Sequence, residues 1–259
     1  MITRMASVAP QVYFLYLRNL RNVTRVPSAL IAPLLIPTFF FIVNGYAFTE
    51  VVRLPGFTTD SYLAWQVAIA IMMTVSVTSV GSGLGIVMDI NSGYLDKLLL
   101  TPVHRPAILL SRLLTEATRV TIQMALIVLI ALGLGVRPEA GAPGILLMIL
   151  LGILWALVYA PISISIALRT RNAEATNASF MLMFPLVFLT TGLMPKEFYP
   201  EWLKIVVALN PVNYVLEGVR APVIAGFQWS TIGWAFLSIA IVGSITLPFG
   251  YLSFQRVTR

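Results

Sequence analysis

Glu116 and Glu217 are the only acidic residues placed to carry a proton or an ion through the apolar parts of this chain. Transport driven by an ion gradient needs ionisable side chains at membrane depth. Arg112 and Arg119 stand about one helical turn on either side of Glu116, a spacing at which helix side chains meet. We therefore interpret Glu116 as a member of an ion pair at the membrane interface. Glu217 and Arg220 have similar spacing and predict a pair on a helix surface; ion coupling remains the alternative.

The usual ingredients of an enzyme site are missing from the sequence. The chain has a single histidine, His104, and no cysteine, so neither a Cys/His metal cluster nor thiol chemistry is expected. It has no G-x-x-x-x-G-K-[ST] phosphate loop and no credible Ser-His-Asp or paired-carboxylate arrangement. We expect a protein that is not an enzyme by itself and that binds neither a metal nor a cofactor.

The composition is that of a membrane protein. Hydrophobic residues make up 58% of the 259 residues, charged residues make up 10%, and the mean hydropathy is +0.90. Soluble domains carry about 25% charged residues. The net charge of +7 is explained by basic residues that flank membrane spans on the cytoplasmic side, so we expect no nucleic-acid partner.

Six segments are apolar over the length that a membrane-spanning helix needs, about 20 residues. We predict an all-α membrane protein, one transmembrane domain over 1–259, with spans at 29–48, 62–87, 112–135, 144–168, 175–194 and 230–253. Small residues in the span at 62–87 allow close helix packing. A flexible gate in the same span is the alternative.

The basic residues choose the orientation of the spans. Six spans place both termini on one side, and that side then holds twelve basic residues: Arg4, Arg18, Arg21, Arg25, Lys97, Arg105, Arg112, Arg119, Arg169, Arg171, Arg256 and Arg259. The other side holds five: Arg53, Arg137, Lys196, Lys204 and Arg220. The positive-inside rule predicts a multi-pass protein of the cell (inner or plasma) membrane with both termini in the cytoplasm.

The cytoplasmic N-terminal segment, 1–28, is predicted to contain an amphipathic helix over 8–26. Arg18, Arg21 and Arg25 fall on one face and apolar residues on another. Such a helix lies in the membrane interface, with its arginines near anionic head groups. A plain positively charged flank is the simpler alternative.

The stretch 89–106 is the longest polar interruption in the first two thirds of the chain. Asn91-Ser92-Gly93 is a helix start and Thr101-Pro102 a stop, which predicts a short cytoplasmic helix between the second and third spans. We expect another protein to act on this helix. The candidate coupling residues are Asp89, Gly93, Leu95, Asp96, Lys97, Leu98, Thr101, Pro102 and Arg105.

The segment 195–228 is too apolar for a solvated loop, and its apolar runs are too short to span. It predicts two short helices, around 200–209 and 212–219, that form an outer re-entrant hairpin. The hairpin is either a lid or only a seal. Its candidate residues are Asn210, Pro211, Tyr214, Glu217 and Arg220, and a lid would close a substrate path near Phe184, Phe188 and Met194.

Two motifs resemble those of a known family, the type 2 ABC transporter permeases of the daunorubicin-resistance and polysaccharide-export kind. The family pattern of an acidic start, Gly-Thr-Leu-Glu-x-Leu and Thr-Pro is similar to Asp89 to Pro102, with Tyr94 in place of the usual Thr and Asn91 where a second charge is common. The Asn-Pro-x-x-Tyr…Arg pattern is similar to 210–220. Span order and loop lengths extend the resemblance over nearly the whole chain.

The resemblance implies an exporter subunit with a coupling helix and an outer hairpin. It also implies a second permease copy, the same chain or a close paralogue, and two ABC ATPase subunits that bind ATP and Mg. Family substrates are hydrophobic drugs, lipids, lipid-linked glycans and, in some members, sodium. An ion-coupled secondary transporter or channel, and a membrane scaffold without transport, are the alternatives.

Overall fold

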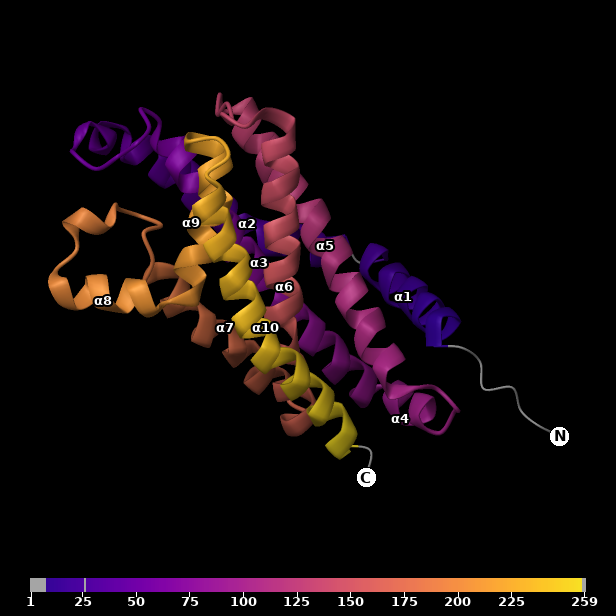
Figure 1. Cartoon of the computed structure of the whole chain (residues 1–259). Coiled ribbons are helices and arrows are strands. Elements are labelled where there is room, and N and C mark those ends of the chain that lie inside the picture. Colours follow the sequence, from indigo (N-terminus) through magenta and orange to yellow (C-terminus); the bar gives the residue numbers. More distant parts are fainter. Residues whose placement is uncertain (1–7, 26, 258–259) are drawn as a thin grey trace.

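The computed structural model describes residues 8–25 and 27–257, which form helices joined by short connections (Figure 1). Arg4, Val26 and Arg259, which the sequence assigns to the cytoplasmic face or to the first helix, lie outside the described residues. The elements are α1 (Val8–Thr24), α2 (Ser28–Ala47), η1 (Thr49–Arg53), α3 (Tyr62–Asn91), α4 (Tyr94–Leu99), α5 (Arg105–Gly133), α6 (Gly141–Thr170), α7 (Ala173–Phe188), η2 (Lys196–Phe198), α8 (Glu201–Leu209), α9 (Pro211–Ile224) and α10 (Trp229–Val257).

Five of the described helices, α2, α3, α5, α6 and α10, are long and apolar enough to cross a membrane. The predicted all-helical membrane fold is therefore confirmed. The segment predicted as the fifth span contains α7, which has only 16 residues and is shorter than the length a full crossing needs. The count of six spans stays a prediction.

Helix α3 lies at the centre of the bundle and packs against α2, α5, α6, α7 and α9. Three of its hydroxyls are satisfied within the helix, because Thr74, Ser76 and Thr78 each donate to the carbonyl four residues earlier. Gly83 brings α3 close to α6, since a Cβ there would lie 2.6 Å from the carbonyl oxygen of Ser163. The small residues therefore serve close packing.

Helix α5 begins earlier than the sequence predicts, at Arg105 instead of residue 112. Pro106 stands in its first turn, where the missing N–H of proline costs nothing. The preceding His104 is extended, so the chain enters the helix directly. As a result Arg105 belongs to α5 and not to a loop, whereas Arg112 lies within the helix as predicted.

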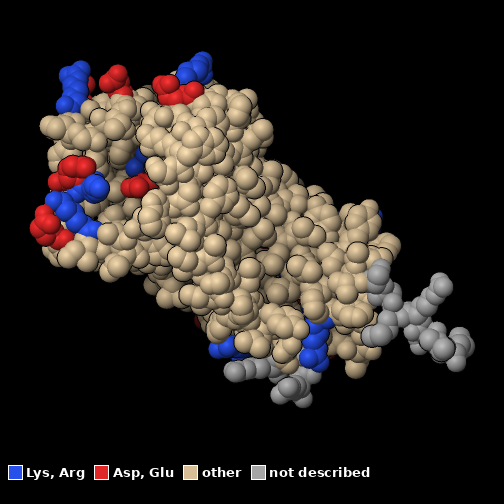
Figure 2. All heavy atoms as spheres, viewed as in Figure 1, with Lys and Arg blue, Asp and Glu red and all other residues tan. Residues whose placement is uncertain are grey.

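The two ends of the bundle carry different elements. Helix α4, the start of α7 and the end of α10 lie at the lower end in Figure 1, whereas η1 and the α5–α6 turn lie at the upper end. Helix α8 projects sideways from the bundle. Figure 2 shows Lys, Arg, Asp and Glu gathered toward the ends of this face, with a broad uncharged band between them, as expected for a surface that contacts lipid.

Candidate functional site

The predicted cytoplasmic helix is α4, which follows α3 after a sharp reversal of the chain. Gly93 makes this reversal in the left-handed conformation, with φ 66°, which glycine adopts without strain. Leu95 points into the bundle and is buried, whereas Asp96 and Lys97 are exposed. Helix α4 therefore has one face anchored and one face open.

The anchored face of α4 enters an apolar cluster at the lower end of the bundle. Leu95 is buried in this cluster, and Leu98 packs at its edge. The other buried members come from α3, α5, α6 and α10: Ile86, Val87, Ile108, Leu109, Leu113, Ala160, Ile164, Ala167, Leu168 and Phe254. Because packed cores deform little, a displacement of α4 acts on four long helices.

The segment after α4 remains near the surface. The Thr101 hydroxyl donates to the carbonyl oxygen of Leu98 at 2.6 Å and closes the last turn. Thr101 and Pro102 are exposed, Leu100 is 88% exposed, and Arg105, half-buried, begins α5. This exposed leucine is a signal for a partner surface that the sequence analysis overlooked.

Asp89 lies in the last turn of α3 and is buried rather than exposed to a partner. Arg18 of α1 donates to both of its oxygens, at 2.7 and 3.0 Å, and Arg112 of α5 also pairs with it. Burial alone would lower the pKa of Arg18, but the hydrogen bond and charge of Asp89 outweigh burial and raise this pKa. Asp89 thus joins three helices directly above α4.

This arrangement corrects two sequence interpretations. Arg18 points at Asp89 and not toward lipid head groups, whereas Arg21 and Arg25 are exposed as predicted for an interfacial helix. Arg112 pairs with Asp89 and not with Glu116. Both errors have one cause: helical spacing predicts neighbours within a helix but not partners on another helix.

Glu116 is fully buried between α5 and α3, and not at an exposed interface. Its Oε2 accepts a hydrogen bond from the Ser82 hydroxyl at 2.6 Å and lies 3.6 Å from Nη1 of Arg119. Arg119 fits because Gly81 leaves a notch, where a Cβ would lie 2.7 Å from its guanidinium. The predicted pair with Arg119 is present, in a buried setting.

At the end predicted to face outward, the chain leaves the helical conformation after α7 while still inside the protein. Four consecutive carbonyls, of residues 190–193, are each bound by a side chain from another segment. Tyr199 donates to Thr190, Arg220 to both Thr191 and Gly192, and Tyr62 to Leu193, at 2.8 to 3.2 Å. Irregular backbone inside a membrane protein requires such partners. We call this segment, 189–195, the outer break.

Asn210 joins α7 to α9. Its amide nitrogen donates to the carbonyls of Leu186 and Leu189, at 2.6 and 2.7 Å, at the end of α7. Its amide oxygen accepts from the backbone N–H of Val212, at 3.0 Å, and caps α9. Pro211 occupies the first turn of α9, where proline is well tolerated. One side chain thus ends α7 and starts α9.

Arg220 and Glu217 do not form the surface pair that the sequence predicts. Arg220 is 4% exposed, binds the outer break and lies over the ring of Trp65. The Glu217 carboxylate instead accepts from the hydroxyl of Thr191, at 3.1 Å, and from the amide of Asn213, at 3.3 Å. The predicted pair of Arg220 and Glu217 is wrong because α9 packs inside the bundle, where backbone carbonyls of the outer break lie within hydrogen-bonding distance of Arg220.

Tyr214 lies on α9 at the junction with α8. Its hydroxyl donates to the carbonyl oxygen of Ala208 at 2.7 Å, and its ring lies 5.9 Å from the ring of Trp234 on α10. Tyr214 therefore ties the end of α8 to the last helix. All five predicted hairpin residues lie on α9 or at its start, and none lies on α8.

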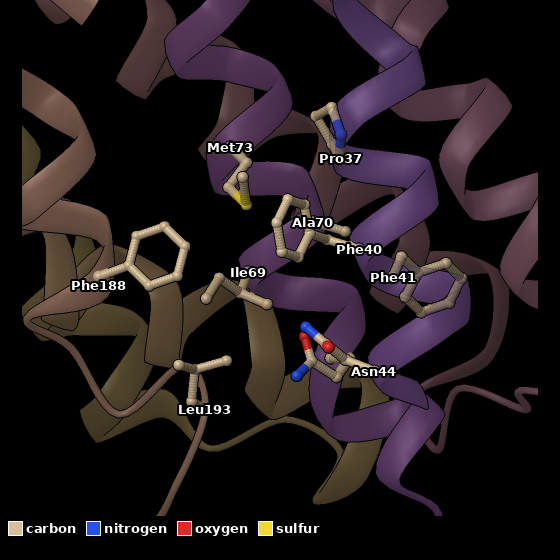
Figure 3. Close-up of a pocket in the computed structure, with 10 residues that line it drawn as sticks. Pro37, Phe40, Phe41, Asn44, Ile69, Ala70, Met73, Phe188 and Leu193 are labelled. Atoms are coloured by element: carbon tan, nitrogen blue, oxygen red, sulfur yellow. The ribbon is translucent and has the colours of Figure 1, made fainter. Parts of the chain in front are cut away.

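A small pocket lies between α2, α3 and the end of α7 (Figure 3). Phe188 and Leu193 line one side, and Pro37 and Phe40 of α2 line the other. Its remaining lining residues are Phe41, Asn44, Gln66, Ile69, Ala70 and Met73. Two amides, Asn44 and Gln66, are its polar groups. The sequence analysis did not find this pocket, because its walls come from separate segments.

The three predicted path residues are only partly brought together. The rings of Phe184 and Phe188 lie 4.5 Å apart between centroids, and Phe184 is exposed on the surface of α7. Met194 is half-buried in the outer break and does not line the pocket. Only Phe188 lines it.

The chain is similar to known proteins over most of its length. A family model described as "ABC-2 type transporter" matches residues 10–224, which include α4 and the outer break. The chain belongs to the ABC-2 type transporter family. Its members are membrane permease components of ABC transporters and work with an ABC ATPase.

Several curated relatives of this ABC-2 permease cover most of its length. A transport permease, ycf38, of Cyanophora paradoxa is 28% identical over 232 residues, 88% of this chain and 77% of the relative. A doxorubicin resistance ABC transporter permease, DrrC, of Mycobacterium tuberculosis is 25% identical over 240 residues, which are 89% of this chain and 83% of the relative. A daunorubicin resistance ABC transporter permease, DrrB1, of Streptomyces coeruleorubidus is 24% identical over 198 residues, which are 75% of this chain and 68% of the relative.

Proposed function

We propose that this ABC-2 permease is the membrane half of an ATP-driven exporter that moves a hydrophobic or amphiphilic molecule outward. Two permease copies, identical or close paralogues, work with two ATPase subunits that bind ATP and Mg. Both termini and α4 face the cytoplasm of a cell (inner or plasma) membrane. The ATPase acts on the exposed face of α4.

The observation that carries this proposal is the two-sided character of α4. Leu95 is buried among residues of α3, α5, α6 and α10, whereas Asp96, Lys97 and Leu100 are exposed. A short helix that only connected two spans would need neither an anchored face nor an exposed leucine. This arrangement suits an element that receives a push and passes it to the bundle.

The proposed substrate class is supported by the names of two relatives and by the lining of the pocket in Figure 3. Its walls are aromatic and aliphatic, and the amides of Asn44 and Gln66 are its polar groups. In this structure the pocket holds only about 10 Å³, the space of one water molecule, so it marks a position along the path and not a closed site for a whole ligand. The drug resistance named for two relatives fits the same class. A drug, a lipid or a lipid-linked glycan is therefore the proposed cargo, with Phe188 at the path.

Inside-out vesicles that contain the permease and its ATPase provide the test. We expect ATP-dependent uptake of doxorubicin or of a fluorescent phospholipid, and no uptake with the permease alone. Uptake without ATP that collapses with an ionophore, and that Glu116→Gln abolishes, would favour the ion-coupled alternative. No uptake of either probe by an assembled, ATP-hydrolysing complex would contradict export of this substrate class and favour a scaffold.

Orientation is tested on the same vesicles. The chain has no cysteine, so Lys97→Cys on α4 and Lys204→Cys on α8 each introduce one thiol. A membrane-impermeant maleimide should label position 97 from the cytoplasmic side and position 204 from the opposite side. The reverse pattern would contradict the proposed orientation and, with it, an ATPase contact at α4.

A further inference from the structure

Helix α1 binds both ends of the segment that contains α4. At the start, Arg18 binds Asp89 and lies over Tyr94, the first residue of α4. At the end, the backbone N–H of His104 donates to the side-chain oxygen of Gln11 at 2.9 Å. These contacts join residues that are 71 and 93 positions apart, so α1 closes over the α4 segment like a brace.

Arg18 makes two contacts that together orient α4 relative to α3. Its guanidinium donates to both oxygens of Asp89, at 2.7 and 3.0 Å, and its central carbon lies 3.5 Å from the centroid of the Tyr94 ring. A planar guanidinium can satisfy a carboxylate and stack on an aromatic ring at once, which an ammonium cannot do. The last turn of α3 and the first turn of α4 are thus held by one side chain.

The joint between α3 and α4 needs such a brace. Gly93 is a single left-handed glycine, and apart from its chain neighbours none of the described residues has an atom within 4 Å of the position that its Cβ would occupy. No side chain therefore packs on that side of the joint. Leu95 anchors α4 in the apolar cluster, and Leu98 and Leu99 pack at its edge, but these three contacts lie on one face of a six-residue helix and leave its tilt about that face to other contacts.

Loss of the brace need not disrupt the bundle. Arg112 also pairs with Asp89, so the carboxylate keeps a charged partner when Arg18 is replaced. The Arg18 side chain is 31% exposed, so water reaches the vacated position. The orienting effect of Arg18 is therefore separable from folding.

We propose that Arg18 is a positioning residue for the coupling helix: it sets the tilt of α4 relative to α3, and α1 thereby forms part of the element on which the ATPase acts. This inference rests on the proposed contact between α4 and the ATPase. It predicts that α4 still contacts the ATPase when Arg18 is replaced, but transmits the movement of the ATPase poorly. The reason is that the force from the ATPase then rotates α4 about Gly93 instead of displacing the bundle.

The test uses the assembled complex in nanodiscs, with spin labels at Asn22→Cys on α1 and Lys97→Cys on α4, both exposed positions in a cysteine-free chain. Arg18→Gln removes both contacts, and Tyr94→Leu removes only the stacking. We expect a narrow distance distribution in the parent and a second, displaced population in both variants. In Arg18→Gln the ratio of braced to displaced orientation should fall about tenfold, from the loss of a cation–π contact and a partly buried ion pair. In Tyr94→Leu the ratio should fall less, because the ion pair remains.

Two matched controls accompany these variants. Arg21→Gln removes an exposed arginine from the same helix, and Tyr94→Phe keeps the ring; both should retain the parent distribution. A second label pair, Arg53→Cys and Lys204→Cys at the outer end, reports the response to ATP and vanadate. That response should fall about as much as the braced population, while ATP hydrolysis continues.

The outcomes separate this inference from the proposed function. An unchanged α1–α4 distribution in both Arg18→Gln and Tyr94→Leu would overturn the brace, and so would displaced populations with a normal response at the outer end. A crosslink from Lys97→Cys to the ATPase reports the contact itself. If the parent complex formed no such crosslink, the proposed function of α4 would fail whatever the distances showed.

Discussion

The guanidinium of Arg220 lies 3.8 Å from the centroid of the Trp65 ring, and both residues are buried. Arg220 comes from α9 and Trp65 from the start of α3, so the contact joins the outer hairpin to the central helix. The same guanidinium binds the carbonyls of Thr191 and Gly192. A single cation therefore fixes α3, α9 and the outer break relative to one another.

Arg220→Lys should destabilise the permease despite the retained charge. A lysine cannot reach two carbonyls and stack on the indole together, and hydrogen bonds to charged groups contribute about 1.5–3 kcal/mol each. We expect a loss of about 3 kcal/mol, visible as a lower thermal midpoint in detergent and faster proteolysis of 195–228. Lys204→Gln, which breaks only a surface pair with Glu201 on α8, is the control and should cost under about 1 kcal/mol. Equal thermal midpoints for the parent and Arg220→Lys would contradict this role of Arg220.

Asn210→Ala should weaken the junction between α7 and α9. The variant leaves the carbonyls of Leu186 and Leu189 without their partner and removes the cap of α9. A lost cap costs about 1 kcal/mol and unpaired buried carbonyls add to this, so we expect a loss of about 2–3 kcal/mol. Hydrogen exchange should rise in 186–192. The exposed Asn177 is the matched control, because Asn177→Ala should leave exchange there unchanged.

Asp89→Asn should destabilise the lower end of the bundle. It leaves Arg18 and Arg112 facing each other without the carboxylate that both bind, and breaking a buried pair in this way costs about 3 kcal/mol. Thermal unfolding of the purified permease measures the effect. Glu50→Gln breaks the exposed pair with Arg53 and should cost under about 1 kcal/mol. Similar losses in the two variants would contradict the assigned burial.

Gly83→Ala should force α3 and α6 apart. Its Cβ would lie 2.6 Å from the backbone oxygen of Ser163, an atom that cannot move without its helix, and overpacking costs about 1–3 kcal/mol. Gly233→Ala is the matched control, because none of the described residues lies within 4 Å of its Cβ position. That change should stabilise α10 by about 0.5–1 kcal/mol. Thermal midpoints that shift in the same direction would contradict the close approach.

Leu95→Ala and Leu100→Ala should have different effects, because they alter the buried and the exposed side of the α4 segment. Leu95 is buried, and its truncation should cost about 2–5 kcal/mol of stability. Leu100 is 88% exposed, so its truncation should leave stability unchanged. We expect Leu100→Ala to lower retention of the ATPase in pull-down at least about fivefold, as for an apolar anchor of an interface. Full retention by Leu100→Ala would count against a partner surface on α4.

Much of the fold could be predicted from local sequence. The apolar lengths predicted α2, α3, α6 and α10 within a few residues, and Gly93 with Thr101-Pro102 predicted a short helix where α4 lies. Features that depend on contacts between distant segments were not predicted. Helix α7 ends at Phe188 although the apolar run continues to Leu193, because side chains from α3, α9 and the α7–α8 connection bind the carbonyls that would otherwise continue the helix.

By itself, the sequence determined that this protein is a helical membrane protein with a structured polar turn after its second apolar segment. Chain composition and helical periodicity suffice for that, since each is a property of neighbouring residues. Only the tertiary structure decided which charges meet. Asp89 binds Arg18 and Arg112, and Arg220 binds carbonyls and Trp65, because packing brought nearer partners than the helix neighbours. A buried charge takes whichever partners the fold places around it.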